Sequence, residues 1–119
     1  MKVLVVDDSA TMRKIIIRAL TAIGINDTAQ AGDGVEALQL FQQDSFDLVL
    51  TDWNMPNKTG IELVRDIRAA GSSTPVVMIT TEAEKARVLE AIQAGISDYL
   101  VKPFTPDALQ QKLEKFAAV

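Results

Sequence analysis

The 119-residue chain contains no cysteine and no histidine. Without cysteine it can form no disulfide bond, no thiolate metal site and no cysteine nucleophile. Without histidine it lacks the side chain that most often acts as a general base or as a metal ligand. Any chemistry carried out by this chain must therefore depend on carboxylates, amines and hydroxyls.

Long apolar runs and blocks of like charge are also missing. The apolar opening run, Val3 to Val6, covers four residues and ends in two acids, which excludes a signal peptide. No run approaches the roughly 20 apolar residues that a membrane span needs. Twelve basic residues against 16 acidic residues leave a formal charge of -4, with no Lys/Arg block of the kind that binds nucleic acids. We therefore expect a cytoplasmic chain with no membrane insertion and no nucleic-acid partner.

Short β-branched runs alternate with amphipathic stretches along the whole chain. The expected strands are residues 3–6, 28–31, 48–50, 76–79 and 99–101. The expected helices carry apolar residues three and four positions apart: Met12, Ile15, Ile16, Ala19, Leu20 and Ile23; Val35, Leu38 and Phe41; Ile61, Val64 and Ile67; Ala86, Leu89 and Ile92; Leu109, Leu113 and Phe116. Helix starts are expected at Ser9, Asp33 and Thr105, and helix ends at Gly24, Gly71 and Gly95.

This alternation predicts the α/β class. Consecutive strand–helix units give a parallel sheet that is covered by helices on both faces. We expect one domain over residues 1–119, a doubly wound, flavodoxin-like sheet of five parallel strands with five helices on its two faces. Because the sequence stops shortly after the fifth helix, we expect no output domain.

Polar side chains follow four of the five expected strands. Asp7 and Asp8 follow the first, Asp52 the third, Thr80 the fourth and Lys102 the fifth. Ligands of open α/β sheets bind at the carboxyl ends of the strands, so these side chains are expected to converge. Each motif alone also fits a structural role, as a helix cap, an Asx-type turn or a solvated amine. Their occurrence together favours a functional site.

The residue types at this edge indicate phosphoryl transfer. Three carboxylates in one place repel each other, and an all-oxygen cluster suits a hard cation, Mg²⁺ or Mn²⁺. An amine and a hydroxyl beside them would stabilise a phosphoryl group. A carboxylate can also be the nucleophile, giving an aspartyl phosphate. Asp52 is the best candidate for that role, with Asp7 and Asp8 as metal anchors.

The chain resembles the response-regulator receiver family along its whole length. The residues that carry the resemblance are VVDDS (5–9), TDWNMP (51–56), Gly60, MITTE (78–82) and DYLVKPF (98–104). The DWNMP motif and the missing output domain make it similar to the free-standing chemotaxis members. The resemblance implies the strand order 2-1-3-4-5 and a two-component switch that is not an enzyme in the usual sense, since it catalyses only its own phosphorylation and dephosphorylation.

The resemblance also implies roles for single residues. Asp52 would accept the phosphoryl group. The metal ligands would be Asp7, Asp8, Asp52 and the backbone carbonyl of Asn54. Lys102 would pair with the phosphate and precede a cis peptide bond to Pro103. The remaining implied roles are switching by Thr80 and Tyr99, tuning of hydrolysis by Asn54 and Glu82, and a partner face with Lys85, Tyr99 and Lys112. Thr81 stands where many receivers have a smaller residue, and we expect it to narrow access to the phosphate.

The implied partners are a CheA-like histidine kinase as phosphodonor and a downstream target peptide or flagellar motor switch protein. A dedicated phosphatase is left open, and the chain is expected to be a monomer. Other roles for such a receiver are a phosphorelay, a phosphate sink or pilus motility.

The residues also leave two other classes of function open, an enzyme and a ligand-binding module. A Mg²⁺-dependent phosphohydrolase would carry its nucleophile after the first strand, in a DxD motif. A flavin- or nucleotide-binding module would need a Gly- or Ser/Thr-rich phosphate loop there, whereas DDSATM supplies acids.

Overall fold

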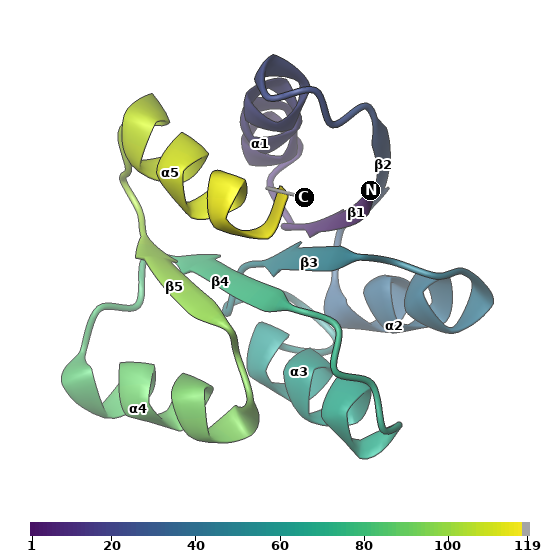
Figure 1. Ribbon diagram of the computed structural model, residues 1–119. Coiled ribbons are helices and arrows are strands. Elements are labelled where there is room, and N and C mark those ends of the chain that lie inside the picture. The colour runs from purple at the N-terminus through teal and green to yellow at the C-terminus, as the bar shows by residue number, and fades with distance from the viewer. Residues whose placement is uncertain (118–119) are drawn as a thin grey trace.

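Strands and helices alternate without exception in the computed structural model, which describes residues 1–117 (Figure 1). The strands are β1 (Lys2–Val6), β2 (Asp27–Ala31), β3 (Leu48–Thr51), β4 (Val76–Thr80) and β5 (Asp98–Val101). The helices are α1 (Ala10–Ala22), α2 (Gly34–Gln43), α3 (Gly60–Ala69), α4 (Lys85–Ala94) and α5 (Pro106–Ala117). All ten expected elements are confirmed, with strand boundaries that differ from the expected ones by one residue at most.

The strands form one parallel sheet in the order β2-β1-β3-β4-β5, as the resemblance implied. Helices α1 and α5 cover one face, while α2, α3 and α4 cover the other (Figure 1). The side chains of the sheet accordingly form two core clusters, one on each face. No helix in residues 1–117 is long and apolar enough to cross a membrane.

Burial explains the composition of the strands. Strand β3 and strand β4 are buried at every position, because helices cover both of their faces. Strand β2 is at the edge of the sheet and exposes Asp27 and Gln30, which accounts for its weak apolar pattern.

Side chains and glycines define the helix boundaries. Ser9, Asp33 and Thr105 each accept a hydrogen bond from a backbone amide of the first helical turn, as expected. Gly24, Gly71 and Gly95 follow helices with positive φ angles of 86°, 84° and 110°. Helix α3 begins with a capping box of Thr59 and Glu62, which was not among the expected helix starts.

The expected orientation of α4 is wrong. Leu89 and Ile92 are 48% and 55% exposed, and the buried residue of the helix is Ala91. Ala91 and Ala94 pack against the core, so the small side chains of α4 face the sheet. Spacing alone did not distinguish this stripe from the stripe of Leu89 and Ile92, because both repeat at three-residue intervals. Two smaller errors of the same kind are Ile15 on α1 and Val35 on α2, both exposed.

Candidate functional site

Three carboxylates meet at the carboxyl ends of β1 and β3. Oxygen atoms of Asp7, Asp8 and Asp52 all lie within 4.8 Å of one another. The register of the sheet brings them together, since Val6 pairs with Thr51 and the Asp52 amide donates to the Val6 carbonyl at 3.0 Å. Asp7 is buried, Asp52 is half-buried and Asp8 is exposed, so the cluster opens to solvent on one side. The predicted convergence of these residues is confirmed.

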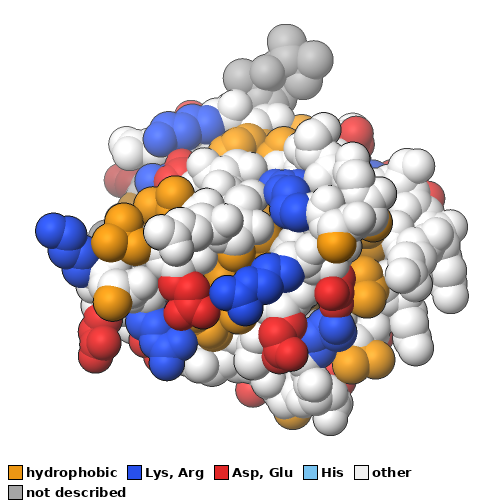
Figure 2. Space-filling model, turned by 90° about the horizontal axis from the view of Figure 1, so that it is seen from below, with side chains coloured by type: hydrophobic (Ala, Val, Ile, Leu, Met, Phe, Trp, Pro, Cys, Tyr) orange, Lys and Arg blue, Asp and Glu red, His pale blue; other side chains and the backbone are white. Residues whose placement is uncertain are grey.

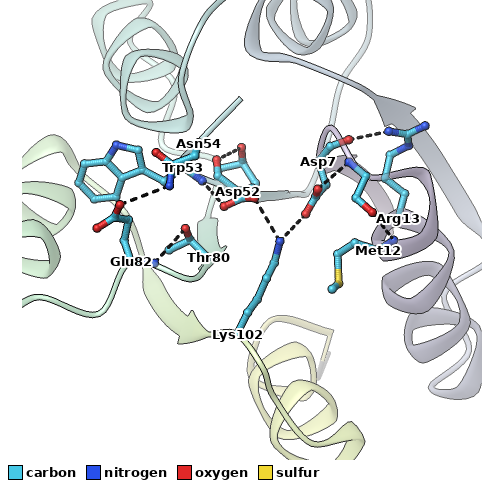
Figure 3. A network of polar contacts seen from close by, with 11 residues as sticks. Asp7, Met12, Arg13, Asp52, Trp53, Asn54, Thr80, Glu82 and Lys102 are labelled. Atoms are coloured by element: carbon cyan, nitrogen blue, oxygen red, sulfur yellow. Dashed lines mark hydrogen bonds and ion pairs between the residues drawn. The ribbon is translucent and has the colours of Figure 1, made fainter. Parts of the chain in front are cut away.

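Lys102 brings a positive charge to the same point from the end of β5 (Figure 3). Its Nζ atom donates to Oδ2 of Asp7 at 2.7 Å and to Oδ2 of Asp52 at 3.1 Å. The side chain is only 10% exposed. Burial by itself would lower the pKa of Lys102, but the hydrogen bond to Asp7 and the charges of Asp52 and Asp7 raise it above its ordinary value, so the ammonium is charged at neutral pH. The Lys102–Pro103 peptide bond is cis, as expected.

Backbone amides fix the orientation of the two inner carboxylates, and Arg13 holds the backbone of Asp7. Oδ1 of Asp7 accepts from the Ser9 amide at 2.9 Å, and Oδ1 of Asp52 accepts from the Trp53 amide at 2.6 Å. Arg13 on α1 donates to the Asp7 carbonyl at 2.5 Å (Figure 3), and it also donates to the side chain of Gln30 at 3.0 Å. Arg13 was not among the expected site residues, because its partner is a backbone atom that no motif marks.

This arrangement fits a hard divalent cation. The donors are carboxylate oxygens from two adjacent strands, the ligand type that Mg²⁺ prefers, and neither histidine nitrogen nor cysteine sulfur is available in this chain. The single ammonium of Lys102 contacts two of the three acids, which leaves Asp8 for a cation to balance. Asn54 is exposed, and its side-chain amide donates to Glu82 at 3.3 Å. The role of its backbone carbonyl as a ligand stays a prediction.

Thr80 and Tyr99 contact the same residue of the loop that follows β4. The buried hydroxyl of Thr80 accepts from the Glu82 amide at 3.3 Å, and the Tyr99 hydroxyl donates to the Glu82 carbonyl. Glu82 therefore connects the ends of β4 and β5, and its carboxylate reaches Asn54 beside the acids. The two predicted switch residues and the two predicted tuning residues thus form one contiguous group. Thr81, between them, is exposed.

Tyr99 is the only tyrosine of the chain, which makes its titration directly measurable. Burial, followed by the negative charges of Glu82 and Asp52, raises the pKa of its phenol above the ordinary value of 10.0. We expect a single phenolate absorbance transition with a midpoint above pH 10. Because the folded-state pKa is the higher one, the stability that it contributes is complete below pH 10.0 and is lost as the pH rises through the folded pKa. A midpoint at or below that of a free tyrosine peptide would contradict the burial.

The predicted partner face lies on α4, β5 and α5. Lys85 is exposed, whereas Lys112 forms an ion pair of 2.8 Å with Asp98. Large apolar side chains accompany them, since Leu89, Ile92 and Val101 are exposed. Figure 2 shows the face of the molecule that includes α3 and α4, on which hydrophobic, basic and acidic side chains are interspersed. The binding of a partner at this face stays a prediction.

Comparison with known families decides the classification. The family described as "Response regulator receiver domain" matches residues 3–114, which is nearly the whole chain. The chain belongs to the response-regulator receiver family.

The relatives of this receiver domain point to the chemotaxis branch of the family. The "Chemotaxis protein CheY" of Pseudomonas aeruginosa is 48% identical over 97% of this chain and 94% of its own length. The "Chemotaxis protein CheY-3" of Vibrio cholerae is also 48% identical, over 97% of this chain and 90% of its own. Among solved structures, CheY4 of Vibrio cholerae superposes with a TM-score of 0.89 at 38% identity, covering 97% of each chain.

A second solved structure shows how far the architecture is shared. The receiver domain of Francisella response regulator 1452 superposes with a TM-score of 0.91 at 34% identity, over 98% of this chain and 96% of that one. The chain is therefore a receiver domain of the CheY type, a regulatory domain of two-component signalling rather than a metabolic enzyme.

Proposed function

We propose that this receiver domain is a phosphorylation-activated switch in which Asp52 accepts a phosphoryl group from a histidine kinase. One observation carries the proposal. The Asp52 carboxylate lies in a cluster of three acids, and the Lys102 ammonium bridges it to Asp7 at distances of 3.1 and 2.7 Å. Phosphoryl transfer to a carboxylate needs a nucleophile beside a cation and beside acids that can hold a metal ion. Asp52 has Lys102 as the cation and Asp7 and Asp8 as the acids.

The transfer itself is a displacement at phosphorus. An oxygen of Asp52 forms the new P–O bond while the P–N bond of the donor phosphohistidine breaks, and the leaving imidazole takes up a proton. Apart from the Asp52 oxygen, no protein atom forms or breaks a bond in this step, so positioning and charge neutralisation dominate catalysis. The Trp53 amide orients the Asp52 carboxylate, and Lys102 neutralises charge that develops on the transferred group.

Asp7, Asp8 and Asp52 would hold Mg²⁺, with the carbonyl of Asn54 as a further ligand. When bound, this cation would neutralise the acids and the oxygens of the phosphoryl group. The chain's own residues prepare the site for it, because the Ser9 amide and Arg13 fix the buried Asp7 before any ligand arrives.

The phosphoryl group would act as a switch through Thr80 and Tyr99. It adds about -1.5 to -2 charges and three acceptor oxygens next to Thr80 and Lys102. Turning the Thr80 hydroxyl toward these oxygens gives up its bond from the Glu82 amide, and the carbonyl of Glu82 is the partner of Tyr99. Shifting such an equilibrium from 1:99 to 99:1 needs about 5.5 kcal/mol, more than one charge-assisted hydrogen bond of about 1.5–3 kcal/mol supplies. We therefore expect a graded shift rather than complete conversion.

The downstream partner would bind the α4-β5-α5 face around Lys85, Tyr99 and Lys112. The names of the relatives favour chemotaxis, with a CheA-like kinase as donor and the flagellar motor switch as target. A phosphohydrolase is less consistent with the site. Such an enzyme would carry its nucleophile in a DxD motif after the first strand, whereas here β1 is followed by two adjacent acids and the proposed nucleophile follows β3.

Intact-mass spectrometry tests the proposal. Incubation with Mg²⁺ and acetyl phosphate is expected to add one phosphoryl group to the wild type and none to Asp52→Asn. The matched control is Asp107→Asn, which removes an exposed acid from α5, and this variant is expected to be phosphorylated like the wild type. Phosphorylation of Asp52→Asn at the wild-type rate would show that the acceptor is another residue, and steady hydrolysis of phosphate esters in solution would instead indicate an enzyme.

A further inference from the structure

Arg87, near the start of α4, lies over the face of the Trp53 indole. The centre of its guanidinium group is 5.4 Å from the ring centroid. The indole is only 4% exposed and packs in the core cluster that lies beneath α3 and α4. Trp53 also belongs to residues 52–60, which we call the acceptor segment because they begin with Asp52. Its amide donates to the Asp52 carboxylate at 2.6 Å, and its carbonyl accepts from the Gly60 amide at 2.9 Å. A side chain of α4 therefore touches the residue next to Asp52.

Two ion pairs extend this contact across the surface. Nη1 of Arg87 is 3.5 Å from Oε1 of Glu90, and Oε2 of Glu90 is 3.3 Å from Nη2 of Arg65 on α3. All three side chains are more than one-third exposed, so these pairs contribute little to stability. The contact with the indole uses the same half-exposed guanidinium, but it is the one contact of the three that joins α4 to a buried side chain next to Asp52. The contact with Trp53 is therefore the part of this network that can hold α4 in place.

The C-terminal end of α4 is anchored by Arg68 of α3, which donates to the carbonyl of the C-cap residue Gly95 at 3.0 and 2.8 Å, whereas the first turns of the helix have few anchors in the described chain. Ala91 is its buried residue, and its N-cap, Glu84, makes no hydrogen bond from its side chain to the first turn. Leu89 and Ile92 point to solvent. The loop that contains Glu82 leads directly into the helix, so movement of that loop reaches the first turn of α4, where Arg87 lies.

The geometry points to Arg87 as a positioning residue, which holds α4 and the loop after β4, by its contact with Trp53, in the arrangement of the unphosphorylated site. The inference rests on the proposed function. In this arrangement the Thr80 hydroxyl accepts from the Glu82 amide at 3.3 Å. When Thr80 turns toward a phosphoryl group, that bond breaks, the loop moves and Arg87 leaves the indole. Loss of the contact between Arg87 and Trp53 thus favours the arrangement in which Thr80 has turned. A ligand that binds only this arrangement gains affinity by the factor by which the equilibrium between the two arrangements shifts.

Three substitutions separate the contact from its surroundings. Arg87→Met keeps the length of the side chain but removes the charge, while Arg87→Lys keeps a cation that can lie over the ring. Arg65→Gln is the matched control, because it breaks the Glu90 pair on the same surface without touching Trp53. Emission from Trp53, the only tryptophan, reports whether its contact with Arg87 is lost.

Two measurements read out the effect. The first is a beryllofluoride titration in Mg²⁺, followed by the amide NMR signals of Thr80 and Glu82. The second is hydrogen exchange of the α4 amides without any phosphoryl mimic. For Arg87→Met we expect the titration midpoint to fall about two- to fivefold and exchange in the first turns of α4 to rise by about the same factor. Arg87→Lys is expected to lie near the wild type, and Arg65→Gln to be indistinguishable from it.

Either of two results would overturn the inference. Arg87→Met could titrate and exchange like the wild type, or Arg65→Gln could change both quantities as much as Arg87→Met does. In the second case surface charge, rather than the indole contact, would hold the helix. A wild type that ignores beryllofluoride would refute the proposed function instead, and the exchange rates of α4 would still decide the role of Arg87.

Discussion

Phosphorylation of Asp52 by acetyl phosphate is expected to slow by about 10²–10³-fold when Lys102 is replaced by methionine, the usual cost of removing one preorganised donor from such a site. Nζ of Lys102 lies 3.1 Å from the Asp52 carboxylate and 2.7 Å from that of Asp7. Methionine keeps an apolar stem of similar length in this buried position, so the variant removes the charge with little change in packing. The rate of mass increase in the intact protein measures the effect.

The same substitution is expected to strengthen the binding of Mg²⁺. Removal of the ammonium leaves the acids at the ends of β1 and β3 without their bridging cation, so a divalent ion gains a more negative site. A magnesium titration followed by Trp53 fluorescence measures this. Lys115→Met, which removes an exposed lysine of α5, is the control and should change neither quantity. Unchanged phosphorylation in Lys102→Met would contradict the role assigned to Lys102, and weakened ion binding would indicate a damaged fold.

Replacing Gly60 with alanine is expected to lower the free energy of unfolding by about 3 kcal/mol, at the upper end for atoms forced into a packed region. A Cβ atom at this position would lie 1.9 Å from the carbonyl oxygen of Asp52, so either the helix start or the acceptor segment must move. The Gly60 amide also donates to the Trp53 carbonyl at 2.9 Å, and this bond would be strained. Urea unfolding measures the loss, and slower phosphorylation is expected to accompany it.

Gly71→Ala is the matched control for this effect. Gly71 has a φ angle of +84°, and no atom beyond its two chain neighbours lies within 4 Å of the point where its Cβ would be, so alanine there meets strain but no clash. The expected cost is about 1 kcal/mol, from the left-handed backbone conformation alone. If Gly71→Ala proved as destabilising as Gly60→Ala, the close approach of Gly60 to Asp52 would not be the cause.

The central part of the site could be predicted because it depends on topology. Parallel strands end at one edge of the sheet. Asp7, Asp52 and Lys102 directly follow their strands and Thr80 is the last residue of β4, so all four lie at that edge. The apolar runs that mark β1, β3 and β4 are clear for the same reason, since these strands are buried on both faces. The positions of these strands and of the polar residues at their ends can therefore be predicted from short segments of the sequence.

The contacts of Arg13 and Arg87 could not be predicted in this way. Arg13 binds a backbone carbonyl and Arg87 lies over an indole, so neither partner is marked by spacing or by complementary charge. The orientation of α4 was wrong because its buried side is made of small residues such as Ala91, whose apolar signal is weaker than that of Leu89 and Ile92. The capping box of Thr59 and Glu62, by contrast, has a local sequence signature, a threonine followed three residues later by a glutamate.

The ion pair of Lys102 and Asp7 joins residues 95 positions apart. During synthesis the ammonium emerges from the ribosome long after the acids, and it takes its place only when β5 has added to the sheet. If Asp52 accepts the phosphoryl group as proposed, a chain without β5 would have the acceptor without its counter-charge, and its transfer from the donor would be slow. On the proposed function, full reactivity toward the donor would therefore require the complete sheet, including its last strand.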